Sequence, residues 1–282
     1  MRAIILNLSA WAILPFMDTI AKYLSAELSF FQITWARYFF TVFWTLPFMF
    51  IFFRKKLTFS ENPKLQILRG LTLFSANICF FYSISVISMA KALTLAFVAP
   101  LVTTALSPIL LGEKVGIKRW TAVIVGFIGS LVVIRPGFIE FNLATVAALG
   151  TGCLYGVYLI ITRKLHSTDN PLLTLLLTGI VGATVSTFFV PIVWINPSNI
   201  QWLWLAIMGI FACLGHILLI YSLRYADASK LAPFGYFEII TNIIIGYYFF
   251  NHFPDSWTFI GLLIIISSGI YIFRRDALNR PN

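Results

Sequence analysis

The chain has 282 residues, of which 60% are hydrophobic and only 11% are charged, and its formal net charge at pH 7 is +10. Soluble domains carry charged residues at about a quarter of their positions, so this composition excludes an ordinary soluble fold. The three cysteines, Cys79, Cys153 and Cys213, all lie in apolar surroundings and indicate neither a disulfide framework nor a metal site.

Apolar residues come in ten runs, each about 18 to 24 residues long. A helix rises about 1.5 Å per residue, so each run is long enough to cross about 30 Å of hydrocarbon. The connections are short and leave no separate extramembrane domain. We expect an all-α integral membrane protein with ten transmembrane helices, at about 4–24, 30–53, 65–87, 92–111, 118–135, 143–162, 171–194, 201–223, 231–250 and 256–273.

The basic residues predict which helix ends face the cytoplasm. With the N-terminus inside, 16 of the 20 Lys and Arg residues fall in cytoplasmic segments, as the positive-inside rule requires. We expect both termini in the cytoplasm, a location in the bacterial inner membrane and no nucleic-acid partner. The cytoplasmic set is Arg2, Arg54, Lys55, Lys56, Lys64, Arg69, Lys114, Lys118, Arg119, Arg163, Lys164, Arg224, Lys230, Arg274, Arg275 and Arg280.

The first run has a short basic start like a signal peptide, but Asp18 and Lys22 interrupt it and no small-residue cleavage site follows. We interpret it as a retained helix. Asp18 and Lys22 are four residues apart and can pair. They form either a self-neutralising pair, with Lys22 reaching the outer surface, or part of a substrate or ion site. Pro15 weakens the helix nearby and favours the second interpretation.

Arg37, in the second run, lies about two turns below the predicted outer surface, with Tyr38 beside it. Arginine keeps its charge and needs an acceptor, for which Asp18 is the obvious partner. Arg37 either binds an anionic group of a substrate or ties the first two helices together.

Glu238, in the ninth run, is the strongest single candidate. Counted from Lys230, it lies about 12 Å from the cytoplasmic end, near the middle of the bilayer. Asn242 and Gly246 share its face, so it points inward. Charged residues at this depth are normally functional, and a buried carboxyl group can carry a proton. Glu238 either binds substrate or a proton, or is a protonated group bonded to another helix.

Further polar residues lie in the third, sixth and eighth runs. Asn77 and His216 match each other under a shift of 139 residues, and His216 suits an interhelical hydrogen bond or a proton relay. Tyr155 and Tyr158 share one helical face, which suits either a pocket for a flat or cationic solute or a plain helix interface. No catalytic residue is expected. The predicted substrate-binding set is Asp18, Lys22, Arg37, Tyr38, Asn77, Tyr155, Tyr158, His216, Tyr236 and Glu238.

The same shift of 139 residues reveals a repeat. The segment 82–91 returns as 221–230, and the ends of the apolar runs fall in register under this shift. Two copies of a unit with five spans have opposite orientations in the membrane, as in many secondary transporters. We predict two inverted repeats, 1–139 and 140–282, in one membrane domain.

Prolines and glycines predict where these helices flex or pack closely. Pro100 and Pro233 lie in equivalent spans of the two repeats, and flexed helices often line a substrate path. With Pro15 they form the predicted flex points. Glycines allow close helix packing in the fifth and tenth spans, at Gly126, Gly129, Gly261 and Gly269.

Several segments together indicate a family. The run 90–137 contains Ala-Pro at 99–100, Gly-Glu at 112–113 and Arg-Trp at 119–120. With MDTIAKYL, WARYFF and LRG earlier in the chain, it resembles the EamA-type ten-span proteins of the drug/metabolite transporter superfamily. The later run RYADASKLAPFGYFE is similar to bacterial riboflavin and S-adenosylmethionine uptake proteins. The chain departs from the family at Asn251 and His252, where a second Gly-Glu is usual.

This resemblance implies two inverted repeats around a central cavity, which move small organic solutes by alternating access. We expect a secondary active transporter of a zwitterionic or aromatic, nucleoside-like metabolite, coupled to protons or to exchange. An exporter of amino acids or related metabolites is the alternative. An intramembrane enzyme would need catalytic motifs, and a passive channel would need a charged ring or filter motif; the sequence contains none of these. The expected partners are a small-molecule metabolite and the lipid bilayer, with no cofactor or metal, in a monomer or homodimer.

Overall fold

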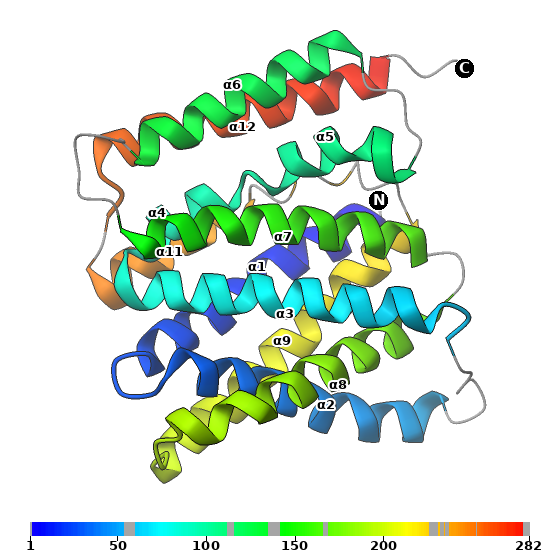
Figure 1. The fold of residues 1–282 in the computed structure, drawn as a ribbon, viewed down its shortest axis with the longest axis vertical. Coiled ribbons are helices and arrows are strands. Elements are labelled where there is room, and N and C mark those ends of the chain that lie inside the picture. Colours follow the sequence, from blue (N-terminus) through cyan, green and yellow to red (C-terminus); the bar gives the residue numbers. More distant parts are fainter. Residues whose placement is uncertain are drawn as a thin grey trace.

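The computed structural model describes residues 2–53, 60–111, 116–134, 142–165, 169–225, 231, 234, 237–251 and 253–278. Within these residues the chain is helical and has no strand (Figure 1). The elements are α1 (Arg2–Leu24), α2 (Phe30–Phe53), α3 (Pro63–Val86), α4 (Met89–Ala96), α5 (Ala99–Leu111), α6 (Ile117–Ile134), α7 (Leu143–Leu165), α8 (Pro171–Phe189), the short 3-10 helix η2 (Val190–Val193), α9 (Asn199–Tyr225), α11 (Phe237–Phe250) and α12 (Ser256–Leu278).

Every predicted apolar run coincides with at least one of these helices. Within the described residues, six segments are long and apolar enough to cross a membrane. The prediction of an all-α membrane protein is therefore confirmed, whereas the count of ten crossings stays a prediction. The six segments are Arg2–Leu24, Pro63–Val86, Met89–Leu106, Leu143–Leu165, Pro171–Val193 and Asn199–Tyr225.

Local sequence signals set several helix starts. α8 begins with Pro171, whose missing N–H costs nothing in the first turn. The side chain of Asn170 caps this turn by accepting a hydrogen bond from the Leu172 N–H at 3.0 Å. α3 likewise begins with Pro63, and Ser88 caps the start of α4.

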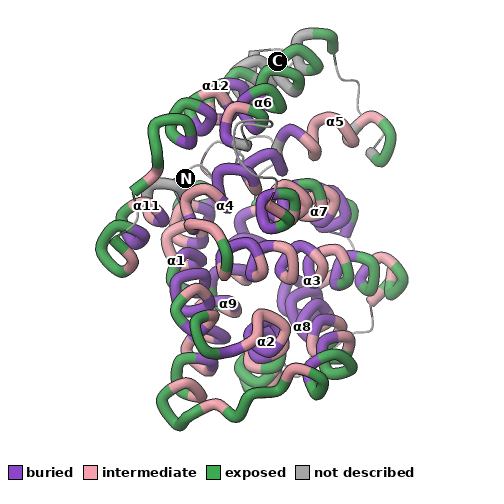
Figure 2. Tube along the Cα trace, turned by 60° about the vertical axis from the view of Figure 1, so that its left-hand side comes forward, coloured by how far each residue is buried: buried purple, intermediate pink, exposed green. Residues whose placement is uncertain are grey.

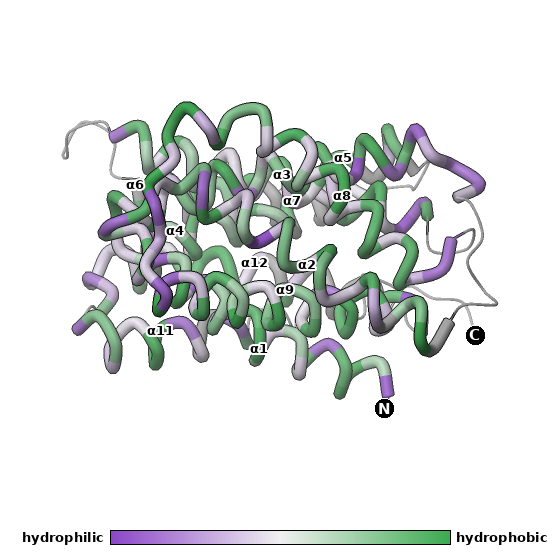
Figure 3. The backbone as a smooth tube through the Cα atoms, turned by 90° about the horizontal axis from the view of Figure 1, so that it is seen from below, coloured by the Kyte–Doolittle hydropathy of each residue, from purple (hydrophilic) through white to green (hydrophobic). Residues whose placement is uncertain are grey.

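The helices pair across the chain rather than with their neighbours in sequence. α1 packs mainly on α9, and α3 on α7. In Figure 1, α6 and α12 lie together at one end of the molecule and α2 and α8 at the other. The start of α1 and the end of α12 lie on the same side of the bundle (Figures 1 and 3).

The bundle is apolar outside and partly polar inside. Ile109, Ile117, Phe188 and Ile192 are each more than three-quarters exposed. Such surface on a soluble monomer would favour association, but it suits contact with lipid. In Figure 3, hydrophilic residues gather mainly near the helix ends. Figure 2 shows the buried residues concentrated where α1, α3, α7 and α9 meet.

The predicted fourth span is broken into α4 and α5. The break covers residues 97–98, directly before Ala99 and Pro100. Proline has no N–H to donate to the carbonyl four residues earlier, so the helix cannot continue normally past Ala96. α7 approaches this break closely: a Cβ on Gly152 would lie 2.7 Å from the Ala96 carbonyl oxygen. The structure therefore has a helix break directly before Pro100, whereas α1 runs through Pro15 without interruption.

Three of the glycines predicted to permit close packing, Gly126, Gly129 and Gly261, do so where α6 meets α12. A Cβ on Gly261 would lie 2.7 Å from the Gly129 carbonyl oxygen and 2.4 Å from a methyl carbon of Val133. Gly126 is equally confined, by Leu101 and Ser268. The backbones of α6 and α12 therefore touch only because these side chains are absent.

Gly261→Ala is expected to lower stability by about 1 to 3 kcal/mol, because the added methyl group must push α6 and α12 apart. Thermal unfolding of the purified protein measures this. Gly116→Ala is the matched control, since a Cβ there meets nothing within 4 Å and should leave the melting temperature unchanged. Equal melting temperatures for all three proteins would contradict the close packing.

Candidate functional site

Arg69 lies in the interior of the bundle. It is 1% exposed and sits two turns into α3. Its guanidinium donates to Thr162 Oγ1 at 2.8 Å and Tyr158 Oη at 2.7 Å on α7, and to the Thr174 carbonyl at 3.3 Å and Thr178 Oγ1 on α8. Arg69 was predicted to lie in a cytoplasmic segment, whereas the structure buries its side chain between α3, α7 and α8. A residue near a span end can turn inward when neighbouring helices offer it acceptors.

Arg37 is also buried, at 2% exposed, but has fewer partners. Its Nε donates to Met17 Sδ at 3.2 Å, and its Nη2 lies 2.6 Å from His216 Nε2. The predicted pairing with Asp18 does not form, because Arg37 contacts the preceding residue of α1 and a histidine of α9 instead. Arg37 does tie helices together, and it interacts with Asp18 only at longer range.

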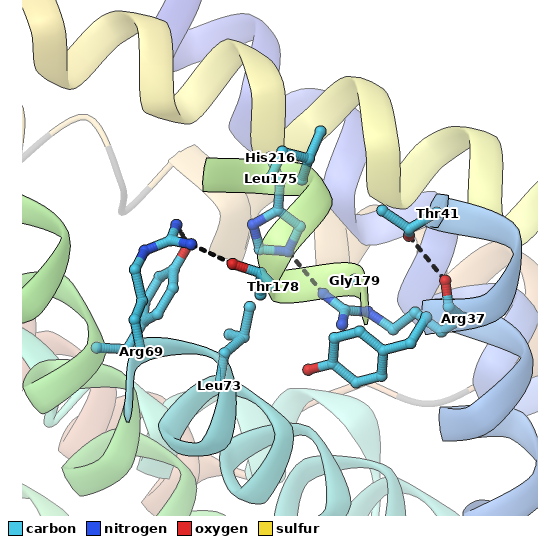
Figure 4. A pocket seen from close by; sticks show the side chains of 10 residues that line it. Arg37, Thr41, Arg69, Leu73, Leu175, Thr178, Gly179 and His216 are labelled. Atoms are coloured by element: carbon cyan, nitrogen blue, oxygen red, sulfur yellow. Dashed lines mark hydrogen bonds between the residues drawn. The ribbon is translucent and has the colours of Figure 1, made fainter. Parts of the chain in front are cut away.

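The two arginines line one pocket (Figure 4). In that view His216 lies between them, with its ring near Thr178 of α8. The pocket has a cavity volume of about 10 Å³, close to that of one water molecule, and takes residues from α2, α3, α7, α8 and α9. Its lining residues are Arg37, Tyr38, Thr41, Arg69, Leu73, Tyr158, Leu175, Thr178, Gly179 and His216.

Aromatic rings complete the pocket walls. The Tyr38 hydroxyl accepts a hydrogen bond from Asn77 Nδ2 at 2.7 Å, and the Arg37 guanidinium carbon lies 4.7 Å from the Tyr38 ring centre. α8 leaves room for this ring, because a Cβ on Gly182 would lie 2.4 Å from it. In the same way, the Arg69 guanidinium carbon lies 4.5 Å from the Tyr158 ring centre. The predicted set thus contributes Arg37, Tyr38, Tyr158 and His216 to one pocket, with Asn77 positioning Tyr38.

Three further members of the predicted set lie close to this pocket. Asp18 and Glu238 are buried, on α1 and α11, and their carboxyl groups are near enough to interact electrostatically. The ring of Tyr155 lies tilted against that of Tyr158, with ring centres 5.1 Å apart, and Tyr155 interacts electrostatically with Glu238, Arg37 and Arg69. The structure therefore brings acidic, basic and phenolic side chains together inside the bundle.

Glu238 points inward as predicted, but its local structure differs from the expectation. The depth estimate assumed one helix from about residue 231, whereas α11 begins at Phe237. Glu238 is therefore in the first turn of α11, where a negative side chain is favoured by the helix dipole. Asn242 and Gly246, one and two turns later, are buried with it. Tyr236, Pro233 and His252 lie outside the described residues.

Lys22 has a different partner from the one predicted. Its Nζ donates to the Ile84 carbonyl and, at 3.3 Å, to the Ile87 carbonyl, at the C-terminal end of α3. Lys22 does not pair with Asp18. A cation at a helix C-terminus satisfies carbonyls that have no partner within the helix.

Lys22→Met is expected to lower stability by about 1.5 to 3 kcal/mol, because it removes charge-assisted hydrogen bonds to the end of α3. Transport rates should change little. Thermal unfolding and initial uptake rates measure the two effects, with the exposed Lys64→Met as control. Loss of transport without loss of stability would instead make Lys22 a substrate ligand.

One sequence pattern does point to the pocket residues that the prediction missed. Thr174 and Thr178 lie one turn apart on α8, and Thr162 ends the polar face of α7 that also carries Tyr158. Hydroxyl groups at this spacing on two helices indicate a buried donor between them. They do not indicate that the donor is Arg69.

A helical membrane bundle with an apolar exterior and a charged internal pocket is typical of proteins that carry polar solutes across membranes. Comparison with known proteins supports this class. The model of the EamA-like transporter family matches residues 1–135 and again residues 142–274. The chain belongs to the EamA-like transporter family.

Named relatives are transporters as well. The chain is 30% identical over 270 residues to an S-adenosylmethionine uptake transporter of Rickettsia conorii, covering 94% of this chain and 90% of that protein. It is 28% identical over 184 residues to a riboflavin transporter of Vibrio cholerae, covering 64% and 61%. One solved crystal structure covers 95% of this chain and 97% of its own with a TM-score of 0.68. At 16% sequence identity, this similarity shows a shared fold and nothing about function.

Proposed function

We propose that this protein is a secondary active transporter of the bacterial inner membrane, which moves a small zwitterionic, nucleoside-like metabolite by alternating access. Both termini would lie in the cytoplasm. The observation that carries the proposal is the internal pocket between Arg37 and Arg69, with Asp18 and Glu238 close by. Buried groups of both signs suit a solute that itself carries both signs.

The helix pairings support a mechanism with two inverted halves, 1–139 and 140–282. Exchanging the halves turns the contact of α1 with α9 into that of α7 with α3, and both are extensive. The contact of α2 with α9 likewise becomes that of α8 with α3, which also forms. The pairs α2 with α8 and α6 with α12 map onto themselves. Such a two-fold relation is expected of ten helices in two inverted repeats.

S-adenosylmethionine is the first candidate solute. It carries an amino group, a sulfonium, a carboxylate and an aromatic base, which matches the charges and tyrosines of the interior. The Rickettsia conorii relative bears the name of an uptake transporter for this compound over nearly the whole chain. Riboflavin, an aromatic but uncharged solute, is the comparison that the Vibrio cholerae relative suggests.

Uptake into membrane vesicles of defined orientation tests the proposal. Vesicles containing the protein should accumulate labelled S-adenosylmethionine above the level of empty vesicles, and an imposed proton gradient or internal exchange substrate should raise that level. The direction of driven flux separates import from export. Vesicles that take up neither S-adenosylmethionine nor riboflavin nor any amino acid above background would refute the proposal.

A further inference from the structure

We propose that the pocket lined by Arg37, Arg69 and His216 binds an oxyanion, the carboxylate or phosphate group of the transported solute. This assignment rests on the proposed function for the identity of the solute. Its basis in the structure is the hydrogen-bonding character of the pocket, which offers donors in several directions, one of them, on His216, without an acceptor among the described residues.

His216 supplies the first of these donors. The guanidinium of Arg37 can only donate, so His216 Nε2, 2.6 Å away, accepts its hydrogen bond. In the neutral ring the hydrogen then sits on Nδ1. His216 is 5% exposed, and its Nδ1 has no partner among the described residues. A buried N–H without an acceptor is costly, so this atom indicates a missing ligand that accepts a hydrogen bond.

The two tyrosines supply further donors. Tyr38 Oη accepts from Asn77, and Tyr158 Oη accepts from Arg69. Each hydroxyl has one hydrogen of its own, which these bonds leave available. The threonine hydroxyls differ, because Thr41 and Thr178 donate to carbonyls of their own helices. The tyrosines therefore add O–H donors to the N–H donors of Arg37 and His216.

The charge of the pocket points to the same ligand. Neither guanidinium is within ion-pair distance of a carboxylate in the described part of the chain, and the partners of Arg69 are all neutral. Buried charges are normally paired. Arginine binds carboxylate and phosphate through two parallel N–H groups, and a carboxylate has about four lone-pair positions to accept them and the other donors. A neutral amide could not satisfy this arrangement, because half of its polar atoms are donors.

Binding to the purified full-length protein in detergent tests the assignment, at constant ionic strength. The probes are S-adenosylmethionine, its decarboxylated form, acetate, acetamide and inorganic phosphate. Removing the carboxylate from S-adenosylmethionine should weaken binding at least tenfold in calorimetry. Acetate or phosphate should raise the melting temperature, whereas acetamide should not. A response to phosphate alone would identify the bound group as a phosphate.

Variants connect these responses to the pocket. Arg37→Gln should weaken S-adenosylmethionine binding by about tenfold to hundredfold and abolish its advantage over the decarboxylated form. If Arg37→Gln does not fold, Tyr158→Phe serves as a second variant in the same binding assay, because it keeps the ring and removes one donor. Ser222→Ala is the matched control, because it breaks a buried contact between α1 and α9 at Asn7, away from the pocket.

Equal binding of S-adenosylmethionine and its decarboxylated form would overturn the assignment. So would the absence of any response to acetate and phosphate, or the same response in Arg37→Gln. The proposed function is tested independently of the oxyanion site. Oxyanion binding without solute movement in vesicles would refute transport but not the oxyanion site. Equal uptake of S-adenosylmethionine and its decarboxylated form would refute the oxyanion site but not transport.

Discussion

Arg69→Met is expected to reduce transport at least a hundredfold while leaving the melting temperature unchanged or higher. The guanidinium of Arg69 is almost fully buried, and its partners are neutral groups of α7 and α8. Replacing buried charges by apolar side chains of similar size is often neutral or stabilising. Arg69→Met removes these hydrogen bonds together with the desolvation cost of the buried guanidinium, so we expect little net loss of stability. Loss of a buried charge contact to the solute costs about 3 kcal/mol, which is about a hundredfold in rate.

Initial uptake rates in proteoliposomes and thermal unfolding in detergent measure the two effects on the same preparation. Arg2→Met is the matched control, since Arg2 is exposed at the start of α1. Normal transport by Arg69→Met would show that Arg69 is not part of the solute-binding site. A variant that unfolds at a much lower temperature would make Arg69 a structural link between α3, α7 and α8.

Glu238→Gln is expected to abolish proton-driven accumulation while leaving solute exchange in place. The Glu238 carboxyl group is buried and interacts electrostatically with Asp18 and Tyr155. Two interacting carboxyl groups take up protons as a coupled pair, so the charge of one affects the solute and the other. Glutamine keeps the shape of the side chain and cannot release or bind a proton in this range.

The measurement is the steady-state accumulation of labelled solute at several external pH values, with the internal pH fixed. Wild-type accumulation should rise with an inward proton gradient, and the Glu238→Gln level should stay flat, at least tenfold lower at the steepest gradient. Glu27→Gln, an exposed glutamate near the end of α1, is the control. An unchanged pH profile in Glu238→Gln would exclude proton coupling through this residue.

Much of the fold is predictable from the sequence because the bilayer imposes simple rules. Apolar run length located the helices, and the break before Pro100 followed from the chemistry of proline. The glycine contact between α6 and α12 was predictable for the same kind of local reason. These features depend on neighbouring residues in the sequence and on hydrocarbon thickness.

The partners of the charged residues were less predictable. Asp18 was expected to pair with Lys22 or Arg37 because helical spacing and depth favoured those contacts. In the structure, packing of α2 against α9 and of α1 against α3 supplies other acceptors, namely His216 for Arg37 and the end of α3 for Lys22. Packing between helices that are distant in sequence determines which partner each charged side chain contacts. This packing is not predictable from a single sequence.

Arg69 illustrates the limit of the charge rule. Basic residues close to a span end usually lie in the cytoplasm, and Arg69 is only six residues from the start of α3 at Pro63. Its direction around the helix, toward Thr162 and Thr178, decides its environment. The candidate site was therefore only partly predictable: Arg37, Tyr38, Tyr158 and His216 were in the predicted set, and the second arginine was not.

Counterflow in proteoliposomes is the sharpest test of alternating access, because it requires a solute site that faces one side of the membrane at a time. Vesicles loaded with excess unlabelled S-adenosylmethionine are diluted into a trace of labelled S-adenosylmethionine. An alternating-access carrier should concentrate the label transiently inside, and the overshoot should disappear in Arg37→Gln. Label that only equilibrates without an overshoot, or that never enters above the level of protein-free vesicles, would contradict the account.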